Sequence, residues 1–397
     1  MRLHRLFVHA ILLVVLLASP QPATGDAATG PFILMDLGTL GGNRGVARAV
    51  NNSGQVVGTS STAGGKNRAF SWTAAGGMID LGTLGGTFSE TAGVNSSGQV
   101  VGRSRTAGDA LTHAFSWTAA GGMVDLGTLG GTDSFAAAVN DSGQVVGRSC
   151  TAGGVEIHAF SWTAAGGMID LGTLGNDSLA AAVNASGQVV GYGQTTPGGA
   201  AHAFSWTAAG GMVDLGTLGG TDSSAAAVND SGQVVGLSST AGGAAHAFSW
   251  TAAGGMSDLG TLGNDSSAAA VNASGQVVGD SISLGRLHPV LWQPIAILGC
   301  TATLAGCNLK EANLAGAYLK DGDLSDANLK GANLARANLS GANLSGTNLK
   351  DANLTNANLA AAQLTGANVQ DVIWSNTICP DGTNSDANGG TCEGHLG

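Results

Sequence analysis

The sequence predicts an all-β protein whose larger part is a six-bladed β-propeller. The first observation is a unit of about 45 residues that recurs along residues 31–294. Six tryptophans mark it, at spacings of 45, 45, 44, 44 and 42 residues: Trp72, Trp117, Trp162, Trp206, Trp250 and Trp292. The second observation is a shorter repeat over residues 302–375, with an apolar residue at every fifth position from Leu304 to Trp374. A tail, residues 376–397, completes the chain.

Residues 1–25 are typical of an export signal. Arg2 and Arg5 precede an apolar run, and small residues follow at 23–25. A bilayer span needs about 20 apolar residues, and this run is shorter, so we expect cleavage; a retained anchor is the alternative. We expect a secreted or extracellular protein after bacterial-type export, with the periplasm as a second location, and no membrane span after signal removal.

The charge of the expected mature chain is acidic. Loss of Arg2 and Arg5 leaves 13 Lys and Arg against 26 Asp and Glu, and 13 − 26 gives −13. A chain with this charge does not attract nucleic acid or anionic lipid as a whole. We therefore expect no nucleic-acid partner.

Each long unit predicts four short strands. In the third unit, Phe135 to Asn140 and Gln144 to Ser149 flank Asp141-Ser142-Gly143, which is typical of a hairpin turn. His158 to Thr163 and Met168 to Leu171 supply two further extended segments. Such a sheet cannot bury its aromatic residues alone, so neighbouring units must stack. Four strands in this period are typical of a propeller blade.

The ends of the long repeat suggest how the ring closes. The last unit lacks a fourth strand before Pro294, whereas Phe32 to Leu37 resembles such a strand and precedes every complete unit. We expect this segment to complete the last blade, which would remove free sheet edges. A linear solenoid or another ring of sheets is the alternative.

The motifs HAFSWT and VNxSGQVVG make the long unit similar to the HAF-type extracellular repeat. The first unit departs from it at Arg68, and the last has His288-Pro289-Val290 instead. The resemblance implies export and a repeat module, without a known reaction. The His-Ala-Phe copies begin at His113, His158, His202 and His246.

The short repeat resembles the pentapeptide-repeat family, A(N/D)LXX, in about fifteen copies. This resemblance implies a right-handed quadrilateral β-helix with four repeats per coil. Residues 20 apart would then share a face, which stacks Lys310, Lys330 and Lys350. We interpret this column as a solvated face, with a cationic strip for a polymer or partner as the alternative.

Five cysteines in an exported chain predict disulfides. Cys379 and Cys392 bracket the tail, and Cys300 and Cys307 lie at the junction of the two repeats. We expect both pairs to form. Cys150 is left over, either as a free thiol or as a partner in an intermolecular disulfide.

Three repeated features tempt a chemical interpretation. The His and Asp columns recur once per unit, so they are spread among blades instead of converging, and a structural His–Asp or His–Ser hydrogen bond is expected. The Asn140-Asp141-Ser142-Gly143 turn faintly resembles a calcium site, but the equivalent turns Asn51-Asn52-Ser53-Gly54 and Asn184-Ala185-Ser186-Gly187 carry no carboxylate. We therefore predict no catalytic residue, metal site or cofactor.

Function is expected where the units differ. Seven basic residues lie in the first three units, and no Lys or Arg occurs between Ser149 and Gly285. We predict that this basic arc contacts an anionic glycan or a surface protein, with ordinary solubility charges as the alternative. Its residues are Arg44, Arg48, Lys66, Arg68, Arg103, Arg105 and Arg148.

The leading functional prediction is an exported, non-enzymatic binding or surface-scaffold protein. The alternative is an exported propeller enzyme, such as a polysaccharide lyase or hydrolase, and it rests on fold analogy alone. No unique carboxylate pair, Ser–His pair or tyrosine constellation favours it, since Tyr192 and Tyr318 are the only tyrosines.

Overall fold

The computed structural model describes residues 35–396, apart from 155, 295–297, 299 and 301–302. The predicted export signal, residues 1–25, lies outside the described residues. The described elements are strands and two short 3-10 turns, η1 (Ala107–Asp109) and η3 (Ser385–Asn388). No helix in the described part is long and apolar enough to cross a membrane.

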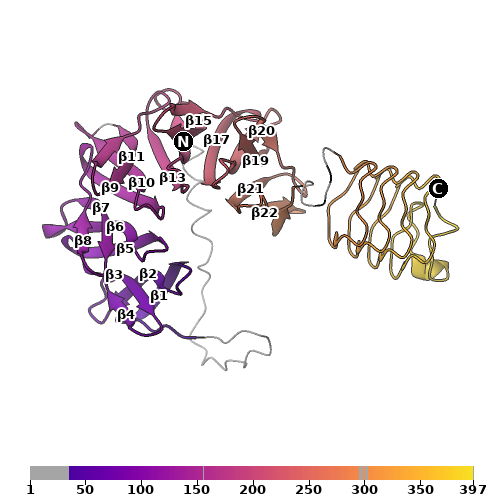
Figure 1. Cartoon of the computed structure of the whole chain (residues 1–397), viewed down its shortest axis with the longest axis horizontal. Helices are drawn as coiled ribbons and strands as arrows, with labels where there is room; N and C mark the ends of the chain where they lie inside the picture. Colours follow the sequence, from indigo (N-terminus) through magenta and orange to yellow (C-terminus); the bar gives the residue numbers. More distant parts are fainter. Residues whose placement is uncertain (1–34, 155, 295–297, 299, 301–302, 397) are drawn as a thin grey trace. The chain divides into compact units, whose positions relative to one another are not determined.

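Six antiparallel sheets occupy residues 41–292 of the described chain, and sheets that follow one another in sequence lie side by side (Figure 1). The first five have four strands and the sixth has three. The first two sheets contain β1 (Gly41–Val50), β2 (Val56–Thr62), β3 (Asn67–Thr73), β4 (Gly77–Asp80), β5 (Gly85–Val94), β6 (Val100–Thr106), β7 (Thr112–Thr118) and β8 (Gly122–Asp125). The next two contain β9 (Gly130–Val139), β10 (Val145–Thr151), β11 (Ile157–Thr163), β12 (Gly167–Asp170), β13 (Ser178–Val183), β14 (Val189–Gln194), β15 (Ala201–Thr207) and β16 (Gly211–Asp214). The last two contain β17 (Gly219–Val228), β18 (Val234–Thr240), β19 (Ala245–Thr251), β20 (Gly255–Asp258), β21 (Ser266–Val271), β22 (Val277–Ser283) and β23 (Arg286–Trp292).

The strands of each sheet pair in chain order. In the third sheet β9 pairs with β10, β10 with β11 and β11 with β12, all antiparallel. A bulge interrupts the β9–β10 register beside Gly147. A Cβ atom at Gly147 would overlap the carbonyl oxygen of Phe135, and every other sheet has a glycine at the same place. The glycine of the Val-Val-Gly sequence in the second strand is therefore required by close backbone approach.

Apolar side chains fill the space between neighbouring sheets. Between the first and second sheets, the contacting residues are Val57, Ala69, Leu81, Val100, Phe115 and Trp117. Equivalent clusters recur between each later pair of sheets. Phe115 and its equivalents are fully buried, which contributes about 1.5–3 kcal/mol for each ring. The six sheets thus depend on each other for their cores.

The predicted closure by Phe32 to Leu37 is not present in the described residues. Residues 32–34 lie outside them, and residues 35–37 form no strand. Asp36 accepts a hydrogen bond from the Gly38 amide at 2.9 Å, and Leu40 then bridges to β2 of the first sheet. The chain is thus engaged with the first sheet directly after this turn, and the sixth sheet retains three described strands.

The two end sheets expose apolar residues that middle sheets bury. Val278 on β22 is 46% exposed, whereas its equivalent Val235 in the fifth sheet is fully buried. Val50 on β1 is 65% exposed, whereas the equivalent residues of the later sheets are half-buried. Each end sheet therefore has one face without a neighbouring sheet among the described residues.

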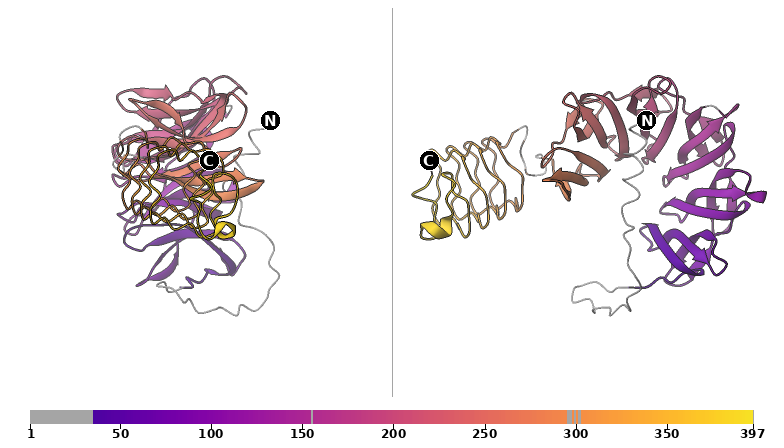
Figure 2. Two further views of the ribbon diagram at one scale, coloured as in Figure 1. Left: turned by 90° about the vertical axis from the view of Figure 1, so that its right-hand side faces the viewer. Right: turned by 180° about the vertical axis from the view of Figure 1, so that it is seen from behind.

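Residues 303–380 wind into stacked coils, visible from the side in the right-hand view (Figure 2). Parallel bridges join residues 20 apart, from Asn308–Asn328 to Asn358–Ile378. This spacing confirms four five-residue repeats per coil. The leucines and the small residues two positions before them form the core. Thr347, at one of the small positions, is fully buried and donates its hydroxyl to the Leu324 carbonyl at 2.8 Å.

Two disulfides confirm the predicted cysteine pairing, Cys300–Cys307 and Cys379–Cys392. Cys150 is a free, half-buried thiol. In the tail, Asp381 accepts hydrogen bonds from the hydroxyl and amide of Thr383 and lies beside His395. The Thr383 bonds, with a smaller effect of His395, lower the pKa of Asp381 to about 2.

Candidate functional site

The asparagine of each hairpin turn links its sheet to the next. Asn140 donates from Nδ2 to the Asn184 carbonyl oxygen at 3.0 Å. The same bond joins the other consecutive sheets at 2.9–3.0 Å. Asn140 Oδ1 also accepts from the Gln144 amide at 3.0 Å, and Gln144 Nε2 donates to Ser161 Oγ at 2.9 Å. The side-chain amides of Asn140 and Gln144 therefore hold the turn and join neighbouring sheets.

The turn geometry confirms a hairpin at this place. The Gly143 amide donates to the Asn140 carbonyl oxygen at 3.0 Å. Asp141 accepts from the amide and hydroxyl of Ser96 in the preceding sheet. Within the described ranges, no group of three or more His, Cys, Asp or Glu residues is arranged to hold a metal ion.

The histidine and aspartate columns form structural pairs. His158 Nδ1 lies 2.7 Å from Asp170 Oδ2, and Asp170 Oδ1 accepts from the Gly172 amide at 2.7 Å. Ser178 Oγ donates to the Gly172 carbonyl oxygen and accepts a hydrogen bond from the Ala159 amide of the preceding sheet. The expected His–Asp hydrogen bond is confirmed in four sheets, at His113–Asp125, His158–Asp170, His202–Asp214 and His246–Asp258. Since each pair lies in a different sheet, the pairs do not converge on one acid–base site.

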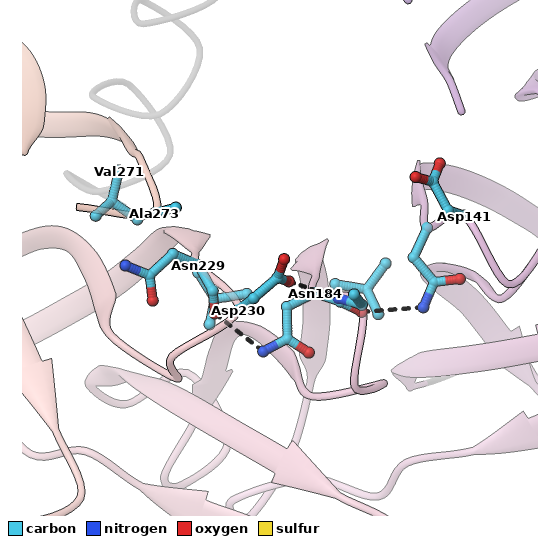
Figure 3. A pocket seen from close by; sticks show the side chains of 10 residues that line it. Asp141, Asn184, Asn229, Asp230, Val271 and Ala273 are labelled. Carbon is cyan, nitrogen blue, oxygen red and sulfur yellow. Dashed lines mark hydrogen bonds between the residues drawn. The ribbon is translucent and has the colours of Figure 1, made fainter. Parts of the chain in front are cut away.

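The hairpin turns of the third to sixth sheets surround a shallow hollow of about 330 Å³ (Figure 3). Its polar lining includes Asp141, Asn184, Asn229 and Asp230. Asp230 accepts from the Ala185 amide at 2.9 Å, and Asn184 donates to the Asn229 carbonyl. The polar groups of the hollow are thus hydrogen-bonded to neighbouring turns, and we do not assign it a reaction.

Part of the predicted basic arc lies near an acidic residue. Asp109 accepts from the amide and hydroxyl of Thr87 at 2.7 Å, and these bonds lower its pKa, with smaller effects of Arg105 and Lys66. The charges of Arg105 and Lys66 therefore face a carboxylate. Arg68 donates from Nη1 to the Gly86 carbonyl oxygen at 3.4 Å.

The two arginines of β1 are exposed and separated along the strand. Arg44 lies near its start, beside Ser60 and Ser61, and Arg48 lies near its end, beside the first hairpin turn. The structure therefore does not gather all seven basic residues into one patch.

Two members of the arc meet at one aromatic ring, in what we call the cation–aromatic cluster: Phe88, Glu90, Arg103, Phe135 and Arg148. The guanidinium carbons of Arg103 and Arg148 lie 4.9 and 4.6 Å from the Phe135 ring centroid. Arg103 lies 5.7 Å from the Phe88 ring and forms an ion pair with Glu90 at 2.5 Å. Cation–π contacts at these distances stabilise by roughly 0.5–2 kcal/mol, depending on exposure.

The cluster arises from cross-strand pairs that differ between sheets. Glu90 is opposite Arg103, and Phe135 is opposite Arg148. In the fourth sheet Tyr192 occupies the position of Arg148; burial raises the Tyr192 pKa, and the charge of Arg148 opposes this rise. The corresponding pairs of the other sheets are Val46–Thr59, Ser224–Leu237 and Ser267–Asp280. The cluster is therefore specific to the second and third sheets.

Arg103 and Arg148 were predicted from the sequence as members of the basic arc, whereas Phe88, Glu90 and Phe135 were not predicted. Alignment of the repeat units provides the missing signal. It places Glu90 and Phe135 at one variable position of the first strand, opposite the variable position of the second strand.

The lysine column of the short repeat lies among carboxylates. Lys310 pairs with Glu311 at 3.4 Å, Lys330 with Asp351 at 4.0 Å, and Lys350 with Asp371 at 3.6 Å. The column is thus largely neutralised, which fits a solvated face.

Comparison with protein families identifies the short repeat. Residues 302–335 and 332–371 match the family described as Pentapeptide repeats (8 copies). Pentapeptide repeats are thus present in the C-terminal region, over residues 302–371. No curated protein matches the chain.

Similar solved structures fall into two groups. A pentapeptide repeat protein from the Arabidopsis thaliana thylakoid lumen is 38% identical over 17% of this chain and 48% of its own, with a TM-score of 0.17. The chain thus spans about half the length of that relative. The β-propeller domain of the Trilobed protease from Pyrococcus furiosus is 10% identical over 62% of this chain and 81% of its own, with a TM-score of 0.44. Virginiamycin B lyase from Staphylococcus aureus is 14% identical over 61% and 82%, with a TM-score of 0.38.

Proposed function

We propose that this chain is an exported, non-enzymatic binding or surface-scaffold protein. In this proposal the six sheets are a β-propeller of HAF-type repeats that binds an anionic glycan or a surface protein. The pentapeptide repeats form a right-handed β-helix that acts as a spacer or packing surface.

The observation that carries this proposal is the use of the shared polar groups. The repeated Asn, Gln, Ser, His and Asp side chains are hydrogen-bonded to each other or to backbone in sheet after sheet. A catalytic site needs a few groups converging in distinct environments. Groups that repeat in every sheet and are already bonded supply a frame, so specificity has to come from the positions that differ.

The variable positions favour binding of an anionic partner. Arg103 and Arg148 occupy them in two neighbouring sheets, together with aromatic rings. Arginine presents a planar set of N–H donors that matches a carboxylate or sulfate and stacks on aromatic rings. These chemical properties suit recognition without turnover.

Two features support export, namely the N-terminal segment and the disulfides. The first 25 residues have the charge and hydropathy of a signal. Two disulfides persist in oxidising compartments and are rare in the cytosol.

A glycan array tests the proposal. The full mature protein is applied to an array of neutral, carboxylated and sulfated glycans. Each glycan that binds is then incubated in solution with the protein and assayed for released reducing ends or unsaturated products. Binding without product release is the expected result. Product release would instead favour a polysaccharide lyase or hydrolase, and binding to no glycan and no cell surface would refute the binding function.

A further inference from the structure

We propose that Arg148 is a carboxylate-binding fork for an acidic sugar, such as a uronic acid residue of a glycan. This inference rests on the proposed binding function and narrows its ligand class. It follows from a comparison of two arginines that share one aromatic ring but differ in their ionic partner.

Arg103 shows how the fork is occupied within the protein. Its guanidinium lies over Phe135 and Phe88, and its Nε donates to Glu90 Oε1 at 2.5 Å. A guanidinium stacked on a ring keeps its in-plane N–H groups available. Glu90 accepts the Nε donor because it lies directly opposite Arg103 on the neighbouring strand.

Arg148 has the same aromatic support without the carboxylate. Its guanidinium lies 4.6 Å from the Phe135 centroid. The residue opposite Arg148 is Phe135 itself, at the place where the second sheet has Glu90. Within the described part of the chain, Arg148 has no ion pair. The ring therefore orients this guanidinium, and its N–H donors lack the anionic partner that Arg103 has.

The surroundings favour one carboxylate on a sugar over a densely charged polymer. Arg148, Phe135 and Phe88 are half-buried, so an anion there is partly shielded from water and its hydrogen bonds strengthen. Tyr192 lies close enough for the charge of Arg148 to affect its pKa, and the apolar faces of aromatic rings suit the C–H groups of a pyranose. The net charge of −13 expected for the mature chain opposes a heavily sulfated chain. A uronic acid carries one carboxylate per ring and meets both conditions.

The test is isothermal titration calorimetry of the full mature protein with hexagalacturonate. Its methyl ester, which lacks the charges, dextran sulfate and a hexaglutamate peptide serve as comparison ligands. We expect hexagalacturonate to bind and its methyl ester to bind at least tenfold more weakly. Arg148→Ala should weaken binding about tenfold or more, and Arg148→Lys should restore only part of it because lysine lacks the planar fork.

Two further variants separate a ligand contact from a folding effect. Arg105→Ala removes an exposed arginine of the same arc and should leave the Kd within about twofold, since Asp109 already faces it. Glu90→Gln frees the fork of Arg103 and should tighten hexagalacturonate binding several-fold. A gain in affinity cannot result from loss of folding. Circular dichroism confirms that each variant is folded.

The outcomes distinguish this inference from the broader function. Wild-type affinity in Arg148→Ala, equal losses in Arg105→Ala and Arg148→Ala, or equal binding of the methyl ester would overturn the carboxylate fork. Binding of dextran sulfate or hexaglutamate in preference to hexagalacturonate would overturn the assignment to a uronic acid. In all these cases the protein still binds a ligand and the broader function stands, whereas absence of binding to every glycan and surface refutes both.

Discussion

The hydrogen bond between successive turn asparagines predicts a large effect of a nearly isosteric substitution. Asn140→Asp retains the oxygen that accepts from the Gln144 amide and Ser142 hydroxyl. It replaces the Nδ2 donor with an oxygen that faces two acceptors, the Asn184 carbonyl at 3.0 Å and Gln144 Oε1 at 3.2 Å. Gln144 can rotate its amide so that Nε2 donates to the new carboxylate and Oε1 accepts from the Ser161 hydroxyl. The donor to the Asn184 carbonyl has no such replacement.

The expected loss is about 3 kcal/mol in the free energy of unfolding at pH 7. The lost donor bond to the buried Asn184 carbonyl oxygen, now opposed by a carboxylate oxygen, accounts for about 2 kcal/mol. Asn140 is 7% exposed, so desolvation of the new carboxylate adds about another 1 kcal/mol.

Asn272→Asp is the matched control, because Asn272 makes the same local turn contacts at the end of the row. It donates to Gln276 Oε1 at 2.8 Å, is exposed, and has no bond to a following sheet in the described residues. We expect it to cost about 1 kcal/mol. Urea unfolding of both variants and of the wild type, followed by tryptophan fluorescence, gives the comparison.

The pH dependence provides a second signature of Asn140→Asp. Desolvation raises the folded-state pKa of the new carboxyl above its unfolded value of about 4. The destabilisation is therefore full above the folded pKa and shrinks as pH falls, because the neutral acid regains a donor. Equal losses in Asn140→Asp and Asn272→Asp, or a pH-independent difference, would refute the role of the inter-sheet bond.

Three further predictions concern the sheets, the coils and the tail. Gly147→Ala should prevent cooperative folding, because its Cβ would overlap a backbone carbonyl; a soluble variant with a wild-type melting temperature would contradict this. Thr347→Val should cost about 1–3 kcal/mol because it removes one of the two donors to the Leu324 carbonyl oxygen and places a methyl group against it, whereas Thr347→Ala, the residue most coils use there, should cost less; thermal melts rank the two. The Asp381 carboxyl should titrate near pH 2 by NMR, so the contribution of its bonds is present above about pH 4 and is lost as pH falls towards 2; His395→Gln should raise this pKa only slightly, since Thr383 is the larger cause, and a return to the ordinary value would contradict that order.

The repeat periods predicted the sheets and coils because each period is set by local geometry. The Asn-Asp-Ser-Gly turn and the alternation in His158 to Thr163 predicted the strands of the third sheet. The five-residue spacing predicted the 20-residue coil. In both cases the same short motif occurs in many copies that adopt the same local geometry. The prediction therefore does not depend on how any single copy is interpreted.

The cation–aromatic cluster was not predictable in the same way. Arg103 approaches Phe135 across two sheets, and this contact depends on how neighbouring sheets pack, which no single unit encodes. The expected closing segment, Phe32 to Leu37, lies partly outside the described residues, so its pairing with the last sheet stays a prediction.

The row of asparagine bonds also bears on how such a chain evolves. Asn95, Asn140 and Asn184 each donate to the equivalent residue of the following unit. These junctions therefore all pair an asparagine Nδ2 donor with an asparagine carbonyl oxygen. Duplication of one unit in the gene would create a new junction that fits both neighbours without any further mutation. Meanwhile the variable cross-strand pair of the new copy can diverge freely. A protein assembled in this way can acquire new binding surfaces one unit at a time while its scaffold stays unchanged.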